Sequence, residues 1–283
     1  MKFNLTSIKR LVLLVGVMLF IIPQSLMAQK QKPQNLRTYD NEPYHFGFII
    51  AYNNMSYAFK YIDNYQITPH TASEYPNTAD TYFNADAIYY ATKIESSHIP
   101  GFTVGVVGNL RLGKYFDLRL IPSLSFGTRT ITYDFFRTVD DINGMSNKLN
   151  MYFSKKKSIF STFVEFPLQV KYRSKRLNNV AAYLIAGTNF KIDLASQKKS
   201  QIEVNDPITG EQHSVIDNIR VKRGDIAAEI GAGFDFYTSY FKFGVEVKMS
   251  YGLLNILDSQ NLIYDSSIKS LQNRTFQVSL TFE

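Results

Sequence analysis

The chain has 283 residues, a formal net charge of +7, 19 Tyr and 22 Phe, and it contains neither Cys nor Trp. The absence of Cys excludes disulfides, thiolate metal sites and a lipid anchor attached at cysteine. The positive charge is scattered apart from one run at residues 155–157, which argues against nucleic acid, because that partner needs a basic stripe with interleaved aromatic residues.

The N-terminus has the pattern of a secretory signal peptide. Lys2, Lys9 and Arg10 form a positive region, and an apolar run at residues 11–22 follows it. This run is too short to span a bilayer comfortably, since spanning takes roughly 20 residues. The small residue Ala28 completes a cleavage site. An uncleaved N-terminal anchor is the alternative interpretation.

Three regions are therefore predicted. Residues 1–28 are a cleaved signal peptide, and residues 29–43 are a flexible periplasmic lead-in rich in Gln, Lys and Pro. Residues 44–283 are one outer-membrane β-barrel.

Eight segments alternate apolar and polar residues with the period of a β-strand. In residues 241–251 the odd positions hold large apolar or aromatic residues, while the even positions are charged or small. Such a strand needs an apolar solvent on one side and a polar space on the other, which a transmembrane β-barrel provides. The predicted strands are residues 44–59, 101–112, 116–132, 160–173, 181–194, 225–237, 241–251 and 273–283.

The connections between these strands alternate strictly between short and long. The short ones are residues 113–115, 174–180 and 238–240, and the long ones are residues 60–100, 133–159, 195–224 and 251–272. Outer-membrane barrels have short periplasmic turns and long external loops. We therefore expect an all-β, eight-stranded antiparallel up-and-down transmembrane β-barrel in the cell outer membrane. Its last strand ends at the aromatic Phe282, which Glu283 follows.

Two prolines conflict with this pattern. Pro122 and Pro167 fall inside the third and fourth predicted strands, where each removes a backbone donor from the ladder. We expect a bulge or a local break at each of them.

The polar face of the predicted strands decides which side is the interior. A soluble barrel of the lipocalin type would point its apolar face inward. The polar face here balances eight cations against seven anions, which a narrow lumen requires because unpaired buried charges are costly. An eight-stranded lumen filled in this way disfavours a porin. The residues are Arg111, Arg119, Arg129, Lys171, Arg173, Lys191, Lys242 and Lys248, with Asp117, Glu165, Asp193, Asp225, Glu229, Asp235 and Glu246.

Histidines in or beside the predicted external loops are the only candidates for catalysis. His70, His98 and His213 lie there, and a His with a carboxylate and a hydroxyl could form an acyl-transfer site. The nearby acidic and hydroxyl residues are Asp80, Asp86, Glu95, Ser96 and Ser97. No motif fixes their spacing, so we assign no catalytic, cofactor-binding or metal-binding residue and expect a protein that is not an enzyme and has no cofactor.

Basic runs have both a functional and a structural interpretation. Residues 155–157 and 198–199 fall in predicted external loops, where they could contact lipopolysaccharide phosphates or simply remain solvated. Residues 174–179 form a basic periplasmic turn that could dock an acidic partner or merely close a hairpin.

Several segments resemble the PorT (SprT) family. They are residues 44–48, residues 110–127 with the sequence LRLGKYFDLRLIPSLSFG, residues 165–179 with EFPLQVKYRSKRLNN, and residues 193–197 with DLASQ. Both prolines lie inside them. The resemblance implies an outer-membrane component of the type IX secretion system of Bacteroidota, which exports folded proteins and, in gliding species, motility adhesins. It implies no catalytic residue.

We therefore expect a non-enzymatic barrel that serves type IX protein secretion through contacts with other secretion components and with outer-membrane lipid and lipopolysaccharide, without nucleic acid. One alternative is a lipid-modifying enzyme or protease with its active site at the rim. The other is a structural barrel that binds lipopolysaccharide.

Overall fold

The computed structural model describes residues 33–71, 74, 87–139, 149–195, 201–205, 212–216, 219–259 and 262–283. The predicted signal peptide, residues 1–28, lies outside the described residues. Within the described ranges, no helix has the length and apolarity to cross a membrane.

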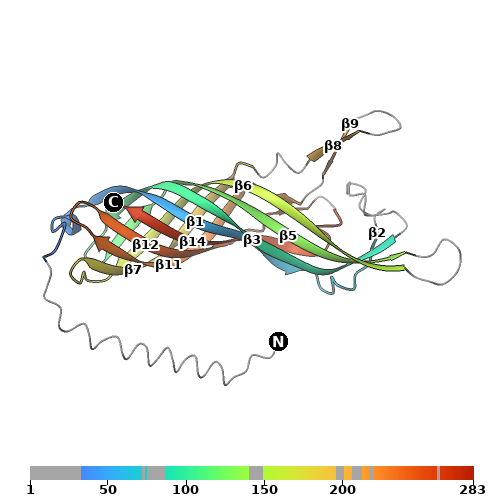
Figure 1. The fold of residues 1–283 in the computed structure, drawn as a ribbon, viewed down its shortest axis with the longest axis horizontal. Coiled ribbons are helices and arrows are strands. Elements are labelled where there is room, and N and C mark those ends of the chain that lie inside the picture. The colour runs from blue at the N-terminus through green and yellow to red at the C-terminus, as the bar shows by residue number, and fades with distance from the viewer. Residues whose placement is uncertain are drawn as a thin grey trace, which may run out of the picture.

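Long antiparallel strands form a closed barrel that lies along the length of the molecule (Figure 1). These strands are β1 (Tyr44–Tyr61), β3 (Ala87–Arg111), β4 (Phe116–Leu120), β5 (Ser123–Val139), β6 (Leu149–Arg173), β7 (Val180–Asp193), β11 (Gly224–Tyr237), β12 (Lys242–Gly252) and β14 (Ile268–Phe282). Shorter elements are η2 (Tyr39–Asn41), β2 (His70–Thr71), β8 (Gln201–Asn205), β9 (Gln212–Ile216), β10 (Arg220–Val221) and β13 (Leu257–Asp258).

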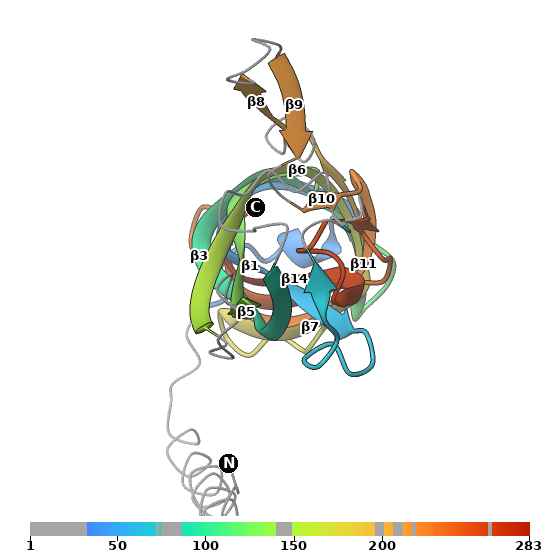
Figure 2. The same cartoon turned by 90° about the vertical axis from the view of Figure 1, so that its right-hand side faces the viewer.

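Each long strand pairs with its neighbours in the chain, and the ring closes where β1 pairs with both β3 and β14. Both β4 and β5 pair with β3 on one side and with β6 on the other. They therefore count as one interrupted strand, and the barrel has eight strands. The ring is visible in the end-on view of Figure 2. The predicted fold class and strand order are confirmed.

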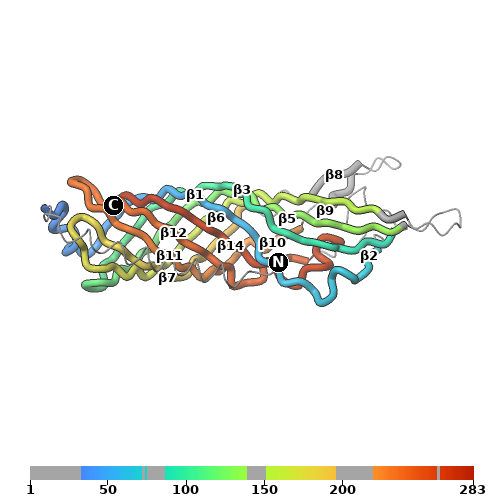
Figure 3. The backbone as a smooth tube through the Cα atoms, turned by 60° about the horizontal axis from the view of Figure 1, so that its bottom comes forward, coloured from blue at the N-terminus to red at the C-terminus, as the bar shows by residue number. Residues whose placement is uncertain are grey.

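The two ends of the barrel differ. We call the end with residues 112–115, 174–179 and 238–241 the turn rim, and the opposite end the loop rim. Residues 33–43 and the C-terminus lie at the turn rim, at the left of Figures 1 and 3. In outer-membrane barrels the short turns are periplasmic.

The two prolines lie beside each other in neighbouring strands. A break at Pro122 is confirmed, since residues 121–122 separate β4 from β5. The break causes no register shift, because β4 and β5 pair with β3 in the same register, and they also pair with β6 in the same register. At Pro167 the prediction was wrong, because β6 continues through it. The carbonyl of Pro167 accepts from Ile121 N at 3.1 Å, so its missing N–H faces the same two-residue gap.

On the turn-rim half of the barrel most apolar side chains face outward and most lumen side chains are polar, apart from a small buried apolar cluster of Ile49, Val107 and Ile121. On β1, Phe46 is 71% exposed, whereas the inward-facing Asn53 is completely buried. On β12, Val247 is exposed and its neighbours Glu246 and Lys248 are buried. This arrangement fits lipid outside and an enclosed polar interior, and it contradicts a lipocalin-like barrel.

The strands extend further toward the loop rim than predicted. Residues 87–100 belong to β3, and β5 and β6 together take most of residues 133–159, so these parts of two predicted loops are strand. Register shifts in the pairing of β3 with β5, at residues 91–93 and 98–102, interrupt the period of two. The inward-facing positions of β3 therefore switch between odd and even residue numbers. The sequence of this strand shows no continuous alternation as a result.

A hydrophobic core fills the barrel at the loop-rim half. It includes Tyr89, Tyr133, Phe135, Tyr264 and Leu271, each at most 1% exposed. Residues between the long strands also belong to this core, namely Ile219, Val221, Ile256, Leu257 and Ile263. The barrel interior is therefore polar in its turn-rim half and apolar in its loop-rim half, whereas we predicted a polar interior throughout.

Candidate functional surfaces

Ion pairs between strands fill the polar half of the lumen. Arg119 Nη1 lies 2.7 Å from Glu246 Oε2, and Lys171 Nζ lies 2.7 Å from Asp235 Oδ2, with all four side chains at most 1% exposed. Further pairs are Lys248–Glu229 at 3.2 Å, Lys191–Glu165 at 3.6 Å and Arg129–Asp193 at 2.7 Å. Each of these side chains is at most 3% exposed, so paired charges occupy the polar half of the lumen.

The charges predicted for the lumen lie where expected, with one exception. All seven anions and seven of the eight cations are buried, and Arg111 is half-buried at the turn rim. An eighth anion, Glu283, was missed. Its side chain is fully buried and lies 2.7 Å from Lys242 Nζ.

Tyr183 links two of these pairs. Its hydroxyl donates to Glu246 Oε2 at 3.1 Å, and its ring lies 3.7 Å from Lys171 Nζ. The ring fits because Gly233 on the adjacent strand has no side chain. A Cβ on Gly233 would lie 2.5 Å from the Tyr183 ring. A glycine thus determines how an aromatic residue and two ion pairs pack together.

Residues 33–43, which belong to the predicted lead-in 29–43, pack on the turn rim, and residues 29–32 lie outside the described residues. The Tyr39 ring stacks on His45 at 3.7 Å, and its hydroxyl donates to Glu283 Oε2 at 3.2 Å. Burial, followed by the Glu283 carboxylate, raises the pKa of Tyr39 well above its ordinary value. The phenol therefore remains a donor at neutral pH.

A second contact attaches the same segment to the basic turn. Asp40 Oδ1 lies 2.6 Å from Arg173 Nη1, and Asp40 Oδ2 lies 3.5 Å from Arg176 Nη1. Asn35 N donates to Asn179 Oδ1 at 2.9 Å. The basic turn that we considered for an acidic partner therefore binds Asp40 of the chain itself, and residues 33–43 close the turn rim.

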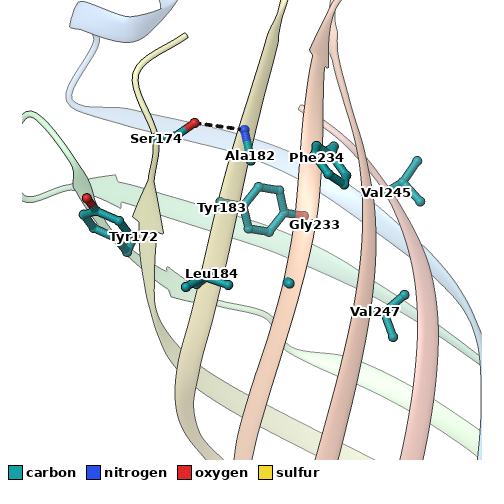
Figure 4. A pocket seen from close by; sticks show the side chains of 10 residues that line it. Tyr172, Ser174, Ala182, Tyr183, Leu184, Gly233, Phe234, Val245 and Val247 are labelled. Atoms are coloured by element: carbon teal, nitrogen blue, oxygen red, sulfur yellow. Dashed lines mark hydrogen bonds between the residues drawn. The ribbon is translucent and has the colours of Figure 1, made fainter. Parts of the chain in front are cut away.

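An apolar groove of about 580 Å³ crosses the outer wall below the turn rim (Figure 4). Lateral pairing explains it. Ala232 lies between Leu184 and Val247 in one row of outward-facing residues, and Ala182 lies beside Phe234 in the next. An alanine in each row leaves a depression between bulkier side chains. Its volume is within the range of about 300–1,000 Å³ that is common for small-molecule sites.

Two of the three candidate histidines, His70 and His98, do not share a site. His70 is buried at the loop rim, where its Nε2 lies 3.4 Å from Ser266 Oγ. His98 is exposed on β3, nine residues beyond Tyr89, the partner of His70. At about 3.3 Å per residue, this separates them by roughly 30 Å. His213 is in β9, whose side chains are not described. Within the described residues, no cluster of His, Asp and Glu could hold a metal ion.

The neighbours of these histidines were placed as follows. Asp80 and Asp86 lie outside the described residues. Glu95 pairs with Lys93 at 2.9 Å on the exposed wall, and the Ser96 hydroxyl accepts from Tyr57 N at 2.9 Å. Ser97 is on β3, next to His98. Among the described residues of this set, no nucleophile, base and carboxylate come together.

The basic run at residues 155–157 belongs to β6 instead of a loop. Lys156 faces outward and is exposed, whereas Lys157 is buried with its Nζ 4.7 Å from the Tyr264 ring. Residues 198–199 lie outside the described ranges. The structure therefore brings no external lysine cluster together at residues 155–157.

A closed antiparallel barrel with an apolar outer belt and a polar lumen defines an outer-membrane β-barrel protein. The chain belongs to the outer membrane protein beta-barrel domain family, which matches residues 28–258. This places it in the outer membrane. Comparison with curated proteins gave no significant match.

The chain is similar to solved outer-membrane barrels at low sequence identity. Neisserial surface protein A is 9% identical, with 85% of this chain and 98% of that chain covered and a TM-score of 0.37. OprG from Pseudomonas aeruginosa is 11% identical, with 90% and 97% covered and a TM-score of 0.37. The outer membrane protease OmpT from Escherichia coli is 10% identical, with 85% and 94% covered and a TM-score of 0.33.

Proposed function

We propose that this protein is a non-enzymatic outer-membrane component of the type IX secretion system, which acts through protein contacts at its turn rim and outer wall. In gliding species the same role would include delivery of motility adhesins. The proposed partners are other components of that system, within outer-membrane lipid and lipopolysaccharide.

The filled lumen is the observation that carries this proposal. Buried pairs such as Arg119–Glu246 and Lys171–Asp235 occupy its polar half, and the hydrophobic core occupies the other half. A barrel packed in this way is unsuited to conducting cargo or solutes. We therefore expect the protein to act through contacts on its outer wall and at its rims.

The segments that resemble PorT support contact at the turn rim in particular. Two of them, residues 110–127 and 165–179, include the turns 112–115 and 174–179. These turns lie side by side, because Arg173 N donates to the carbonyl of Tyr115 at 2.8 Å. Two of the resembling segments therefore meet at one surface, which also holds residues 33–43.

The experiment replaces the gene with variants in a bacterium that has type IX secretion and measures cargo in the medium. Deletion should abolish cargo export. A variant with His70, His98 and His213 all changed to Ala should still export, whereas a rim enzyme would be inactivated. Normal export after deletion, together with a leaky envelope, would replace the proposal with a structural lipopolysaccharide-binding role.

A second measurement identifies the partners. The protein is purified from membranes in mild detergent, and the proteins that accompany it are identified by mass spectrometry. Secretion components should be enriched over a barrel of unrelated function that is purified in the same way. Their absence, with export unaffected by deletion, would overturn the proposal.

A further inference from the structure

The apolar groove on the outer wall leads toward a basic recess at the turn rim. Ser174 lines both, and it is joined to the groove strand β7 because Ser174 N donates to the carbonyl of Ala182 at 2.8 Å. The recess lies between turns 112–115 and 174–176 and residues 34–40, and its volume is about 220 Å³. The apolar groove and the basic recess thus meet at Ser174.

Cations far outnumber anions in the recess. Its lining includes Arg111, Lys114, Arg173, Lys175 and Arg176, and Asp40 is its one carboxylate. In the lumen, by contrast, anions and cations are nearly equal in number. The excess of positive charge is therefore a local property of this rim.

Three of these cations have no acidic partner in the part of the chain that the structure describes. Asp40 is shared by Arg173 and Arg176. Among the described residues, no ion pair includes Arg111, Lys114 or Lys175, although Arg111 Nε donates to the carbonyl of Gly113 at 3.0 Å. Lys114 Nζ lies 5.4 Å from the Tyr115 ring. Their charges are available to an anionic ligand.

Aromatic residues place the recess at the height of lipid headgroups. The rings of Phe116 and Tyr172 lie 5.2 Å apart on the outer wall, and those of Tyr115 and Tyr172 lie 6.4 Å apart. Tyr and Phe at the end of a barrel strand form the girdle that marks the membrane–water interface. Lys114 and Lys175, in the turns just beyond this girdle, are at the level where phosphates of the adjacent leaflet lie.

We propose that this junction is a binding site for one anionic phospholipid of the periplasmic leaflet. The phosphate would lie against Lys114, Lys175 and Arg111, and an acyl chain would lie in the groove between Leu184 and Phe234. Basic clusters at the edge of the membrane recognise anionic headgroups in this way. The proposal is independent of the secretion role.

The groove favours a lipid over a soluble anion or an acidic protein segment. Its floor, at Ala182 and Ala232, is on the wall that faces the acyl chains, and its lining is almost entirely apolar. A free phosphate or an acidic peptide would use the recess alone. Only a molecule with both a charged head and an apolar tail uses both parts.

The test is native mass spectrometry of the mature protein in detergent, titrated with phosphatidylglycerol or with phosphatidylcholine of the same chains. Phosphatidylglycerol should bind more tightly. The double variant Lys114→Ser/Lys175→Ser should weaken it roughly thirtyfold, and Lys60→Ser/Lys269→Ser at the loop rim is the charge-matched control. Ala232→Phe should also weaken binding, and Ala228→Phe, on the same outer face of β11 but outside the groove lining, is its control.

Several results would overturn the proposal. Equal binding of the two lipids, or equal effects of the test and control variants, would mean that the lipid has no specific site. Displacement of phosphatidylglycerol by millimolar inorganic phosphate or by a poly-glutamate peptide, without any effect of Ala232→Phe, would assign the recess to a soluble anion or to an acidic protein. Folding of each variant is checked by its heat-dependent shift in electrophoresis.

Discussion

Lys242 and Glu283 form a fully buried ion pair at 2.7 Å, although Glu283 is the last residue of the chain. Tyr39 completes the arrangement, because it donates to the Glu283 carboxylate at 3.2 Å and its ring lies 4.9 Å from Lys242 Nζ. The C-terminal residue, the start of β12 and the segment before β1 therefore meet at the turn rim. The aromatic end of β14 is followed by a residue that helps to close the barrel.

Replacing Glu283 with Gln should destabilise the barrel. The change leaves the Lys242 ammonium buried without its anion, and breaking a buried pair in this way costs about 3–5 kcal/mol. Urea unfolding of the barrel in lipid vesicles measures the loss. The variant Lys242→Met/Glu283→Met removes both charges and should be much closer to the native protein. Equal losses in the single and double variants would contradict the role assigned to the pair.

Replacing Gly233 with Ala should also destabilise the barrel, by about 1–3 kcal/mol. The new methyl group would lie 2.5 Å from the Tyr183 ring and from the Val245 carbonyl, so the ring must move away from Lys171 and Glu246. Gly224→Ala on the same strand is the control, because a Cβ there has no neighbour within 4 Å. The same unfolding measurement compares them, and similar stabilities of the two variants would show that Tyr183 has room to shift.

The part of each strand that crosses the membrane could be predicted from the sequence, for a physical reason. Lipid outside and ion pairs inside require opposite residue types at successive positions, as at Glu246, Val247 and Lys248, so the period of two is strong. The same contrast predicts the lumen cations and anions from the sequence pattern alone.

The contrast between apolar outward positions and polar inward positions weakens beyond the membrane. The predicted strand ends are wrong there. On β14 the inward positions change from the polar Thr275 and Asn273 to the apolar Leu271. On β3 the register shifts near residues 92 and 100 exchange the two faces. A strand whose inner face becomes apolar, or whose inward-facing positions switch between odd and even, no longer has the pattern of a membrane strand. The pattern of residues 87–100 therefore predicts a loop.

The candidate sites depend on contacts between distant parts of the chain. The groove exists because Ala232 is paired laterally with Leu184 and Val247, which are separated from it along the sequence. Packing of residues 33–43 depends on Asp40 meeting Arg173 and Tyr39 meeting Glu283. Contacts between residues so far apart in the sequence cannot be predicted from a local pattern.

Truncation of leucines on the two sides of β14 should have different effects. Leu271 is fully buried in the hydrophobic core of the loop-rim half, so Leu271→Ala should cost about 2–5 kcal/mol. Leu280 is on the outer wall and 39% exposed. Leu280→Ala should cost only about 1 kcal/mol, because acyl chains can occupy the space that is left. Unfolding in vesicles distinguishes them, and a larger loss at Leu280 would contradict the apolar interior.

Acidification should loosen the loop rim through His70. Burial lowers the pKa of His70 below its ordinary value, and Glu74 opposes this only in part. The folded loop rim therefore favours the neutral imidazole. Its contribution to stability is fully present above about pH 6.5, the unfolded value. It is lost as the pH falls through the lower folded value, because protonation then favours opening.

Hydrogen exchange of residues 262–268 at pH 7.5 and pH 5 measures this effect, because Ser266 contacts His70. The protection factor of that segment, which corrects for the intrinsic pH dependence of amide exchange, should be lower at pH 5 than at pH 7.5 in the native protein. His70→Gln, which cannot be protonated, should remove the pH dependence, whereas His98→Gln on the exposed wall of β3 should leave it unchanged. If His70→Gln retained the full acid response, another group would be responsible for it.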